Sequence, residues 1–166
     1  QLGMGTMVWS PLASGLLSGK YKPSESGFTG EGRLDTTRGI SNPAFQKVSE
    51  RNWKIVTELE TVSKELGRSM AQVAVNWTAN RPGIATVIVG ASKVSQLEDN
   101  IQALDFEIPT ELANRLEAVS RPEPQFPYSF FGAEIQGMIH GGVKVGDKPA
   151  GYQPNVLIQS AGAGVS

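Results

Sequence analysis

Two segments of this chain place small, hydroxyl-bearing and glycine residues directly after a short apolar run. The first reads WSPLASGLLSGKY over residues 9–21, and the second reads VIVGASKVSQLEDN over residues 87–100. Successive backbone N–H groups in turns of this kind form a concave, positively polarised nest that can bind phosphate oxygens. The two segments are therefore the candidate anion-binding sites of the chain.

The first segment also carries an aromatic side chain at the end of its apolar run. The indole of Trp9 could stack on a flat heteroaromatic ring, while Ser10, Ser14 and the amides around Gly15 could hydrogen-bond phosphate oxygens. The residue types alone favour a plainer interpretation, in which Trp9 is a core side chain and an ordinary turn follows it.

The second segment runs from a strand through residues 90–93 into the start of a helix. Phosphate sites form at such places because the free N–H groups and the helix dipole favour an anion. Ser92 and Lys93 add a hydroxyl and a cation, and Gln96 and Asn100 lie one helical turn apart, where they could bind the polar edge of an adenine or a ribose. A capped helix with a polar solvent-facing side explains these residues equally well.

The elements that must position these segments alternate between strands and helices. The apolar patterns predict strands over residues 6–9 and 84–89, helices over 45–66 and 70–80, a helix carrying Val94, Leu97, Ile101 and Leu104, and a last helix after Thr110. This order implies parallel strands joined by right-handed crossovers. The nearly all-apolar strand at 84–89 is typical of a parallel sheet with both faces covered.

Several residues predict where the helices begin and end. Gly67 is expected as a C-cap, Ser69 with Gln72 as a capping box, and Thr110 as an N-cap. Residues 11–44 lack sustained periodicity, and a loop of that length is usually functional. No third strand is recognisable, so the two apolar strands lack partners within the chain.

The charge and composition exclude several classes of function. The net charge is −1 and the cations are scattered, which argues against nucleic-acid or anionic-membrane binding. The chain has no cysteine and one histidine, so neither a disulfide scaffold nor a thiolate or histidine metal cluster is expected. No apolar run is long enough to span a bilayer, and residues 1–4 do not have the pattern of a signal peptide, so we expect a cytoplasmic protein. The lack of an initiator methionine favours a partial sequence.

In this order and with a two-helix spacer, WSPLASGLLSGKY and VIVGASKVSQLEDNIQAL resemble the seventh and eighth βα segments of aldo-keto reductases. Gly-Ala-Ser at 90–92 resembles the potassium-channel β-subunit and aryl-alcohol dehydrogenase branches more closely than the aldose-reductase branch. The resemblance covers about residues 1–120. It implies an α/β fold, the last two βα units of a (β/α)8 TIM barrel, which needs about 250 residues when whole. Residues 121–166 would form a C-terminal extension and flexible tail.

The resemblance implies NADPH or NADP+ as the cofactor. Trp9 would stack on the nicotinamide, and Lys20 and Arg33 would reach over the cofactor from the long loop, with Arg38 as the competitor of Arg33. The pyrophosphate would be lined by Ser10, Pro11, Leu12, Ser14 and Gly15. The 2′-phosphate and the adenine would be held by Gly90, Ser92, Gln96, Asp99 and Asn100.

The family's catalytic Tyr, Lys, Asp and His come from earlier barrel strands, and no matching motif occurs in this chain. Tyr21, Tyr128 and Tyr152 are expected in loops, and His140 as a solvent-facing loop residue, so we assign no catalytic residue. The expected protein transfers hydride between a nicotinamide and an aldehyde or ketone. Its partners are a small carbonyl or alcohol substrate and the missing N-terminal barrel strands.

Two alternatives to a reductase remain open. The chain could belong to a non-catalytic NADPH-binding regulatory module, or it could be one half of a split barrel. Either way, we expect the chain alone to be inactive, and residues 126–131 are only candidate walls of a substrate pocket.

Overall fold

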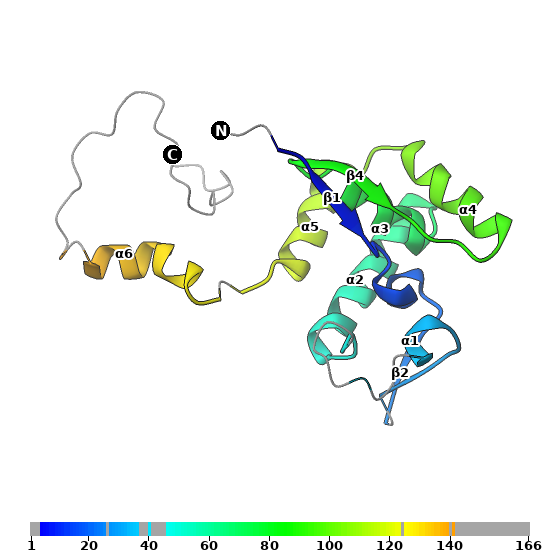
Figure 1. The fold of residues 1–166 in the computed structure, drawn as a ribbon, viewed down its shortest axis with the longest axis horizontal. Helices are drawn as coiled ribbons and strands as arrows, with labels where there is room; N and C mark the ends of the chain where they lie inside the picture. The colour runs from blue at the N-terminus through cyan, green and yellow to red at the C-terminus, as the bar shows by residue number, and fades with distance from the viewer. Residues whose placement is uncertain are drawn as a thin grey trace. The chain divides into compact units, whose positions relative to one another are not determined.

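The computed structural model describes residues 4–25, 27–36, 40, 46–123, 125–139 and 141. They form a mixed α/β structure with parallel strands (Figure 1). The elements are β1 (Thr6–Trp9), the 3₁₀ helix η1 (Ala13–Ser18), β2 (Lys22–Ser24), β3 (Gly27–Thr29), α1 (Arg33–Thr36), α2 (Glu50–Leu66), α3 (Met70–Ala79), β4 (Ile84–Ile88), α4 (Val94–Ile101), η3 (Gln102–Leu104), α5 (Thr110–Ser120), η4 (Tyr128–Phe131) and α6 (Ala133–Ile139). The chain divides into one unit over Gln1–Arg121 and another over Pro122–Ser166.

β1 and β4 pair in parallel, as the order of the elements predicted. Val8 lies opposite Val87 and Trp9 opposite Ile88, so both strands end at the same level of the sheet. α3 packs against β4, and α2 packs against α3 and α5 (Figure 1). The crossover through α2 and α3 therefore joins two neighbouring parallel strands.

The expectation that these strands are buried on both faces is wrong for this chain. Met7 is 63% exposed, and both strands show mostly exposed or half-buried side chains. Within the described residues, the parallel sheet consists of β1 and β4 alone, so much of its surface has no layer over it. The apolar sequence of the strands indicates burial, but the elements that would cover them are not among those described.

The helix ends follow local capping rules. α2 begins at Glu50 because the Ser49 hydroxyl accepts a hydrogen bond from the Asn52 N–H at 3.1 Å. The predicted start at residue 45 lies outside the described residues, and Val48 precedes the helix. Gly67 ends α2 in the left-handed conformation, with φ of 62°, which confirms the predicted C-cap.

The predicted capping box at the start of α3 is also confirmed. The Ser69 hydroxyl accepts from the Gln72 N–H at 3.0 Å, and the Gln72 side chain accepts from the Ser69 N–H at 3.3 Å. The expectation that Thr110 caps α5 is wrong, because Pro109 occupies the cap position and Thr110 is already helical. Pro109 has the extended ψ of 142°, so α5 begins at Thr110, one residue earlier than predicted.

The long segment after β1 contains more regular structure than predicted. β2 and β3 pair as an antiparallel hairpin, and the one-turn helix α1 follows them. The expectation that no third strand exists is therefore wrong. Strands of three residues that contain Pro23, Ser24 and Gly27 carry no periodic signal and use residues that are depleted in sheets.

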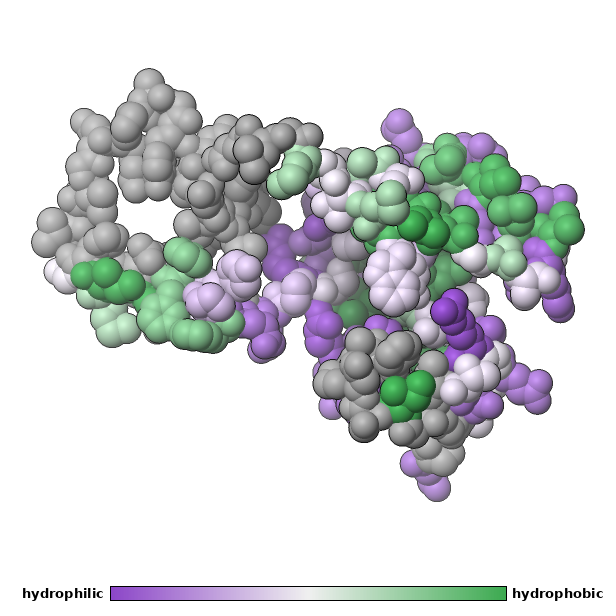
Figure 2. Space-filling model, viewed as in Figure 1, coloured by the Kyte–Doolittle hydropathy of each residue, from purple (hydrophilic) through white to green (hydrophobic). Residues whose placement is uncertain are grey.

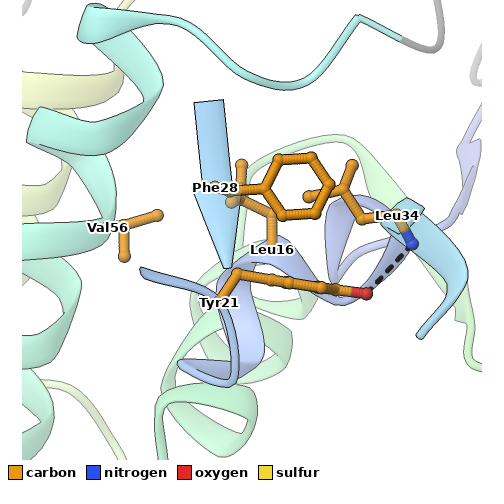
Figure 3. Close-up of a cluster of buried hydrophobic side chains, with 5 residues drawn as sticks. All are labelled: Leu16, Tyr21, Phe28, Leu34 and Val56. Atoms are coloured by element: carbon orange, nitrogen blue, oxygen red, sulfur yellow. Dashed lines mark hydrogen bonds between the residues drawn. The ribbon is translucent and has the colours of Figure 1, made fainter. Parts of the chain in front are cut away.

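The core of the first unit is made by loop and helix residues. One buried group consists of Leu16, Tyr21, Phe28, Leu34 and Val56 (Figure 3). A second group consists of Leu59, Val62, Val73, Ala74 and Leu116. Leu17 and Met70 pack against both groups. The loop after β1 is thereby continuous with the core of the helical layer.

Ion pairs tie α5 to its neighbours. The Arg115 guanidinium donates to Glu58 at 2.7 Å and to Glu65 at 2.8 Å, which joins α5 to α2. Glu117 pairs with Arg81 at 2.6 Å and with Arg121 at 3.0 Å. Partial burial alone would raise the pKa of Glu117, but hydrogen bonds and positive charge from Arg81 and Arg121 hold its pKa below the ordinary value.

The second unit also differs from expectation. Residues 121–166 are predicted as a C-terminal extension and flexible tail, but η4 and α6 lie within them. Phe126 and Phe130 pack edge to face with their centroids 5.6 Å apart. Residues 142–166 of this predicted extension and tail, with Tyr152, lie outside the described residues. Among the described helices, none combines the length and apolarity that a bilayer crossing needs.

An apolar seam runs along α4 and η3. Val94, Leu97, Ile101 and Leu104 have the predicted helical spacing, but they are 73%, 45%, 57% and 69% exposed. Figure 2 shows apolar residues gathered over this part of the molecule. A periodic apolar stripe of this kind normally faces a packing partner, and the described residues supply none.

We predict that the 166-residue chain, expressed alone, binds a hydrophobic dye while keeping its helical circular dichroism. The seam and the sheet leave apolar surface in water, whereas α2 and α3 have their own caps and core. Leu97→Lys combined with Ile101→Lys should lower the dye fluorescence severalfold.

The matched control is Ser95→Lys combined with Glu98→Lys, which adds charge to exposed polar positions of the same helix. It should leave the dye fluorescence unchanged. Equal fluorescence in both double variants would show that the seam is not the dye-binding surface.

Candidate functional site

The two anion-binding segments of the sequence both begin at the carboxyl ends of neighbouring parallel strands. The register that places Trp9 opposite Ile88 brings the start of both loops to one edge of the sheet. In open parallel sheets and in barrels alike, ligands bind outside the carboxyl ends of the strands. This edge is therefore the candidate site of the molecule.

The loop after β1 is held in a strained conformation. Ser10, Ala13 and Ser14 have φ of 57°, 49° and 61°, in the left-handed region that non-glycine residues rarely adopt. Such residues cost of order 1–3 kcal/mol each and cluster at ligand sites. The Ala13 N–H donates to Ser10 O at 3.0 Å, and the Gly15 N–H donates to Leu12 O at 2.8 Å. The chain therefore folds back tightly directly after Trp9.

The side chains of this loop have different surroundings. Trp9 is 70% exposed, so within the described part of the chain its indole is a surface group and not a core group. Ser10, Pro11 and Ser14 are half-buried, and Leu12 packs against the group around Val62. The indole is free to stack on a planar ligand, while Leu12 anchors the loop to the helical layer.

The exposed side chain of Lys20 lies close to two glycines. Its ammonium stands 5.1 Å from the centre of the Tyr21 ring. A Cβ added to Gly15 would come within 2.8 Å of Lys20 Cε, and a Cβ added to Gly32 would meet Lys20 Nζ. We call Gly15, Gly32 and the Tyr21 ring the lysine cradle, because all three lie against this side chain.

Tyr21 fixes the other side of the cradle. The residue is fully buried, and its hydroxyl accepts a hydrogen bond from the Leu34 N–H at 3.0 Å (Figure 3). This bond holds α1, whose first residue Arg33 directly follows Gly32. Lys20 and Arg33 are thereby brought into one neighbourhood, whereas Arg38 lies outside the described residues. Sequence reasoning overlooked this role for Tyr21, although an aromatic residue next to a cation in a glycine-rich loop is a usable signal.

The loop after β4 has an accessible backbone at Gly90, whereas the donors of Ser92 already have a hydrogen-bond partner. A Cβ on Gly90 would meet no atom within 4 Å, so the backbone there is accessible. Lys93 occupies the N-cap of α4 without a side-chain cap bond. The N–H and the hydroxyl of Ser92 donate to Gln96 Oε1 at 2.9 and 3.1 Å. Gln96 thus occupies the Ser92 donors that an anion at this helix start would use.

The structure places Asp99 and Asn100 in surroundings that the sequence did not predict. The Asp99 carboxylate accepts hydrogen bonds from the Ser69 hydroxyl at 2.8 Å and from the Gln72 amide at 2.9 Å. Asn100 is 5% exposed. The structure therefore keeps Ser92 and Gln96 at the open end of α4 and turns Asp99 toward α3.

The described residues include no cluster of three or more His, Cys, Asp and Glu that could hold a metal ion. Tyr128 and the exposed Phe126, Phe130 and Phe131 lie in the second unit, while His140 and Tyr152 lie outside the described residues. The edge has the groups to bind a phosphate-bearing, partly aromatic ligand.

Comparisons with known proteins place this site in context. The sequence model of the aldo/keto reductase family matches residues 1–121. A probable voltage-gated potassium channel subunit beta of Oryza sativa subsp. japonica is 36% identical over 135 residues, which cover 77% of this chain and 39% of the relative. A putative subunit of the same kind from Schizosaccharomyces pombe is 30% identical over 120 residues, covering 70% of this chain and 34% of the relative.

An L-glyceraldehyde 3-phosphate reductase of Escherichia coli (strain K12) is also similar. It is 36% identical over 106 residues, which cover 62% of this chain and 29% of the relative. The chain thus spans less than two fifths of the length of these curated relatives.

We predict that Gly32→Ala weakens the binding of inorganic pyrophosphate about tenfold, the loss expected when one charge-assisted contact is removed. The new Cβ would displace Lys20 Nζ and press on the buried Tyr21 hydroxyl at 2.8 Å. Calorimetry on the complete protein, in which this chain is joined to the segments that its relatives carry outside the matched region, would measure the change.

Gly67→Ala is the control for backbone strain. Gly67 has φ of 62°, but a Cβ there would meet nothing within 4 Å. This variant should lose stability and keep the wild-type affinity for pyrophosphate. If Gly32→Ala also kept that affinity, Lys20 would not be an anion ligand.

Proposed function

The chain belongs to the aldo/keto reductase family, and from this premise we propose that it forms the cofactor-binding end of a (β/α)8 barrel. In this proposal β1 and its loop make the seventh βα unit, β4 and α4 make the eighth, and the residues after 121 form a C-terminal extension. The parallel pairing of β1 with β4 through a helical crossover supports this assignment. The uncovered apolar sides of the sheet and of α4 are surfaces that the other barrel strands and helices would cover.

We propose NADPH as the cofactor. The site offers an exposed indole for the nicotinamide, cations for the pyrophosphate, and a helix N-terminus for the 2′-phosphate, and nothing fills the space over Gly90. The residues that would hold it are Trp9, Ser10, Pro11, Leu12, Ser14 and Gly15, then Lys20 and Arg33, then Gly90, Ser92, Gln96, Asp99 and Asn100. The residue types of this set fit an extended dinucleotide.

The observation that carries this proposal is the register of Trp9 opposite Ile88. It sets an exposed indole and a glycine-rich helix start at the same edge, where a dinucleotide could lie across both loops. Neither loop alone distinguishes a cofactor site from an ordinary turn. Their alignment at one edge supports a cofactor site, because two independent anion-binding turns would match the two ends of a dinucleotide.

The proposed activity of the complete protein is the reduction of an aldehyde or ketone. NADPH, when bound, supplies a hydride to the carbonyl carbon. The residues of this chain would bind and orient the cofactor, and the Trp9 indole would fix the exposed face of its ring. A proton donor for the carbonyl oxygen matters, because general acid catalysis contributes about 10²–10⁴-fold in rate. In this proposal the donor comes from the other barrel segments, since no catalytic residue is assigned in this chain. For that reason we propose that the chain alone is inactive.

A non-catalytic NADPH-binding module is the second candidate. The printed names of the Oryza sativa and Schizosaccharomyces pombe relatives as potassium channel subunits favour it, while the name of the Escherichia coli relative favours a reductase. NADPH-dependent turnover of an aromatic aldehyde by the complete protein would support the reductase. Tight NADPH binding without turnover would support the module.

We predict that the complete protein binds NADPH about 10- to 100-fold more tightly than NADH. The 2′-phosphate would gain charge-assisted hydrogen bonds from the Ser92 region at the start of α4, each worth about 1.5–3 kcal/mol. Fluorescence titration with both cofactors measures the ratio. Equal dissociation constants would contradict the assignment of this helix start to the 2′-phosphate.

We predict that Trp9→Ala weakens NADPH binding about three- to tenfold, since a stacked ring contributes of order 1 kcal/mol beyond its buried area. The midpoint of urea unfolding should change little, because the indole is 70% exposed. Trp9→Phe should restore most of the affinity. Trp77→Ala is the control: the half-buried Trp77 packs against the helical core, so this variant should lose stability and keep its affinity.

A further inference from the structure

The Tyr21 hydroxyl forms a hydrogen bond that spans much of the loop after β1. It accepts from the Leu34 N–H at 3.0 Å, and the two residues are 13 positions apart in the sequence (Figure 3). Tyr21 is fully buried and Leu34 is 2% exposed. Because water does not reach this bond, its loss would leave the Leu34 N–H buried without this acceptor.

The chain between the two partners turns back along the Tyr21 ring. β2 and β3 pair as a hairpin, and the Phe28 ring of β3 meets the Tyr21 ring edge to face with the centroids 5.4 Å apart. A Cβ added to Gly30 would come within 2.9 Å of Tyr21 Cδ1, and a Cβ added to Gly32 would come within 2.8 Å of the Tyr21 hydroxyl oxygen. The segment beyond the hairpin therefore passes directly against this ring on its way to α1.

α1 is too short to hold its own position. It has four residues, and the Asp35 and Thr36 N–H groups both donate to the Gly32 carbonyl oxygen, at 3.0 and 3.3 Å. A single turn of this kind is unstable alone, because helix nucleation is unfavourable. The burial of Leu34 and its bond to Tyr21 fix this turn to the core of the first unit.

Two cations flank the buried bond. Lys20 directly precedes Tyr21, Arg33 directly precedes Leu34, and both side chains are exposed. Neither forms an ion pair with another residue in the described part of the chain. A Cβ added to Gly32 would meet Lys20 Nζ, so the ammonium lies against the residue before Arg33. Two neighbouring positive charges attract an anion more strongly than either charge alone.

We propose that Tyr21 is a positioning residue for the pyrophosphate end of the site: it does not touch the cofactor, but its hydroxyl holds the Leu34 N–H and so keeps Arg33 beside Lys20. This inference rests on the proposed cofactor function, and it names the group that places Arg33. A phenylalanine at position 21 would fill the same space in the core, but α1 would lose this contact.

The test begins with Tyr21→Phe in the complete protein, which removes one oxygen atom and keeps the ring. Each protein is titrated with inorganic pyrophosphate and with adenosine 2′,5′-bisphosphate, which contains no pyrophosphate. Tyr21→Phe should weaken pyrophosphate binding about three- to tenfold and leave bisphosphate binding within about twofold of wild type, because only the cation pair is displaced. Unchanged pyrophosphate affinity would overturn the inference.

A double-mutant cycle shows whether Tyr21 acts through Arg33. Arg33→Ala alone should weaken pyrophosphate binding, and adding Tyr21→Phe to it should cause little further loss, because the side chain that Tyr21 positions is already gone. Losses that simply multiply in the double variant would mean that the two residues act independently. That result would overturn the inference.

Val56→Ala is the matched control for general loss of stability. Val56 is 7% exposed and belongs to the same buried group as Tyr21, but it lies on α2 and leaves the bond to Leu34 intact. This variant should lower the midpoint of urea unfolding and keep the wild-type affinity for pyrophosphate. If it weakened pyrophosphate binding as much as Tyr21→Phe, Tyr21 would be a core residue only and the inference would fail.

Failure of the proposed function would be recognised separately. If the wild-type protein binds neither pyrophosphate nor NADPH, the cofactor assignment fails. Amide hydrogen exchange then decides whether the hydroxyl holds α1. The Asp35 and Thr36 amides should exchange about tenfold faster in Tyr21→Phe than in Val56→Ala, because local opening of α1 becomes easier. Equal exchange rates in the two variants would overturn the positioning role.

Discussion

The parallel pairing of β1 with β4 is the constraint on which the rest of the structure depends. It brings together residues 6–9 and 84–88, which are far apart in the sequence, and both strands end at the same level, with Trp9 opposite Ile88. Every residue of the candidate site takes its place from that alignment, since the loops that follow the strands carry the donors, the cations and the indole. The helices α2 and α3 between the strands set the hand and the spacing of the crossover.

The two loops reach a defined shape by different physical means. The loop after β1 combines left-handed residues, buried aromatic packing and two glycines that make room for Lys20. The start of α4 depends on side-chain hydrogen bonds, from Ser92 to Gln96 and from the α3 cap to Asp99. A strained backbone resists small shifts of the anion ligand, whereas a hydrogen-bonded cap can exchange its partner. In the proposed cofactor complex, a phosphate oxygen would take the place of the Gln96 oxygen as the acceptor of the Ser92 hydrogen bonds.

Local signals in the sequence predicted local structure well. The C-cap at Gly67 and the capping box at Ser69 needed only neighbouring residues, and both are present. The three-residue strands of the hairpin escaped prediction because they are too short for a period to emerge. The cap of α5 was misassigned by one residue because Pro109 and Thr110 are both common at helix starts. The contacts of Asp99 could not be foreseen, since Ser69 is 30 residues away and no local pattern links them.

The separate core of the helical layer has a consequence for how the molecule folds. The group around Val62 and Val73 is made by α2 and α3, which are neighbours in sequence, together with Leu116 of α5, and it does not include β1 or β4. The contacts between α2 and α3 form early, because little loop entropy is lost in making them. Pairing residues 6–9 with 84–88 closes a far longer loop. The entropy of that loop is lost before the strand contacts stabilise the chain. The edge that would receive a ligand is therefore assembled late, on a helical scaffold that has already formed.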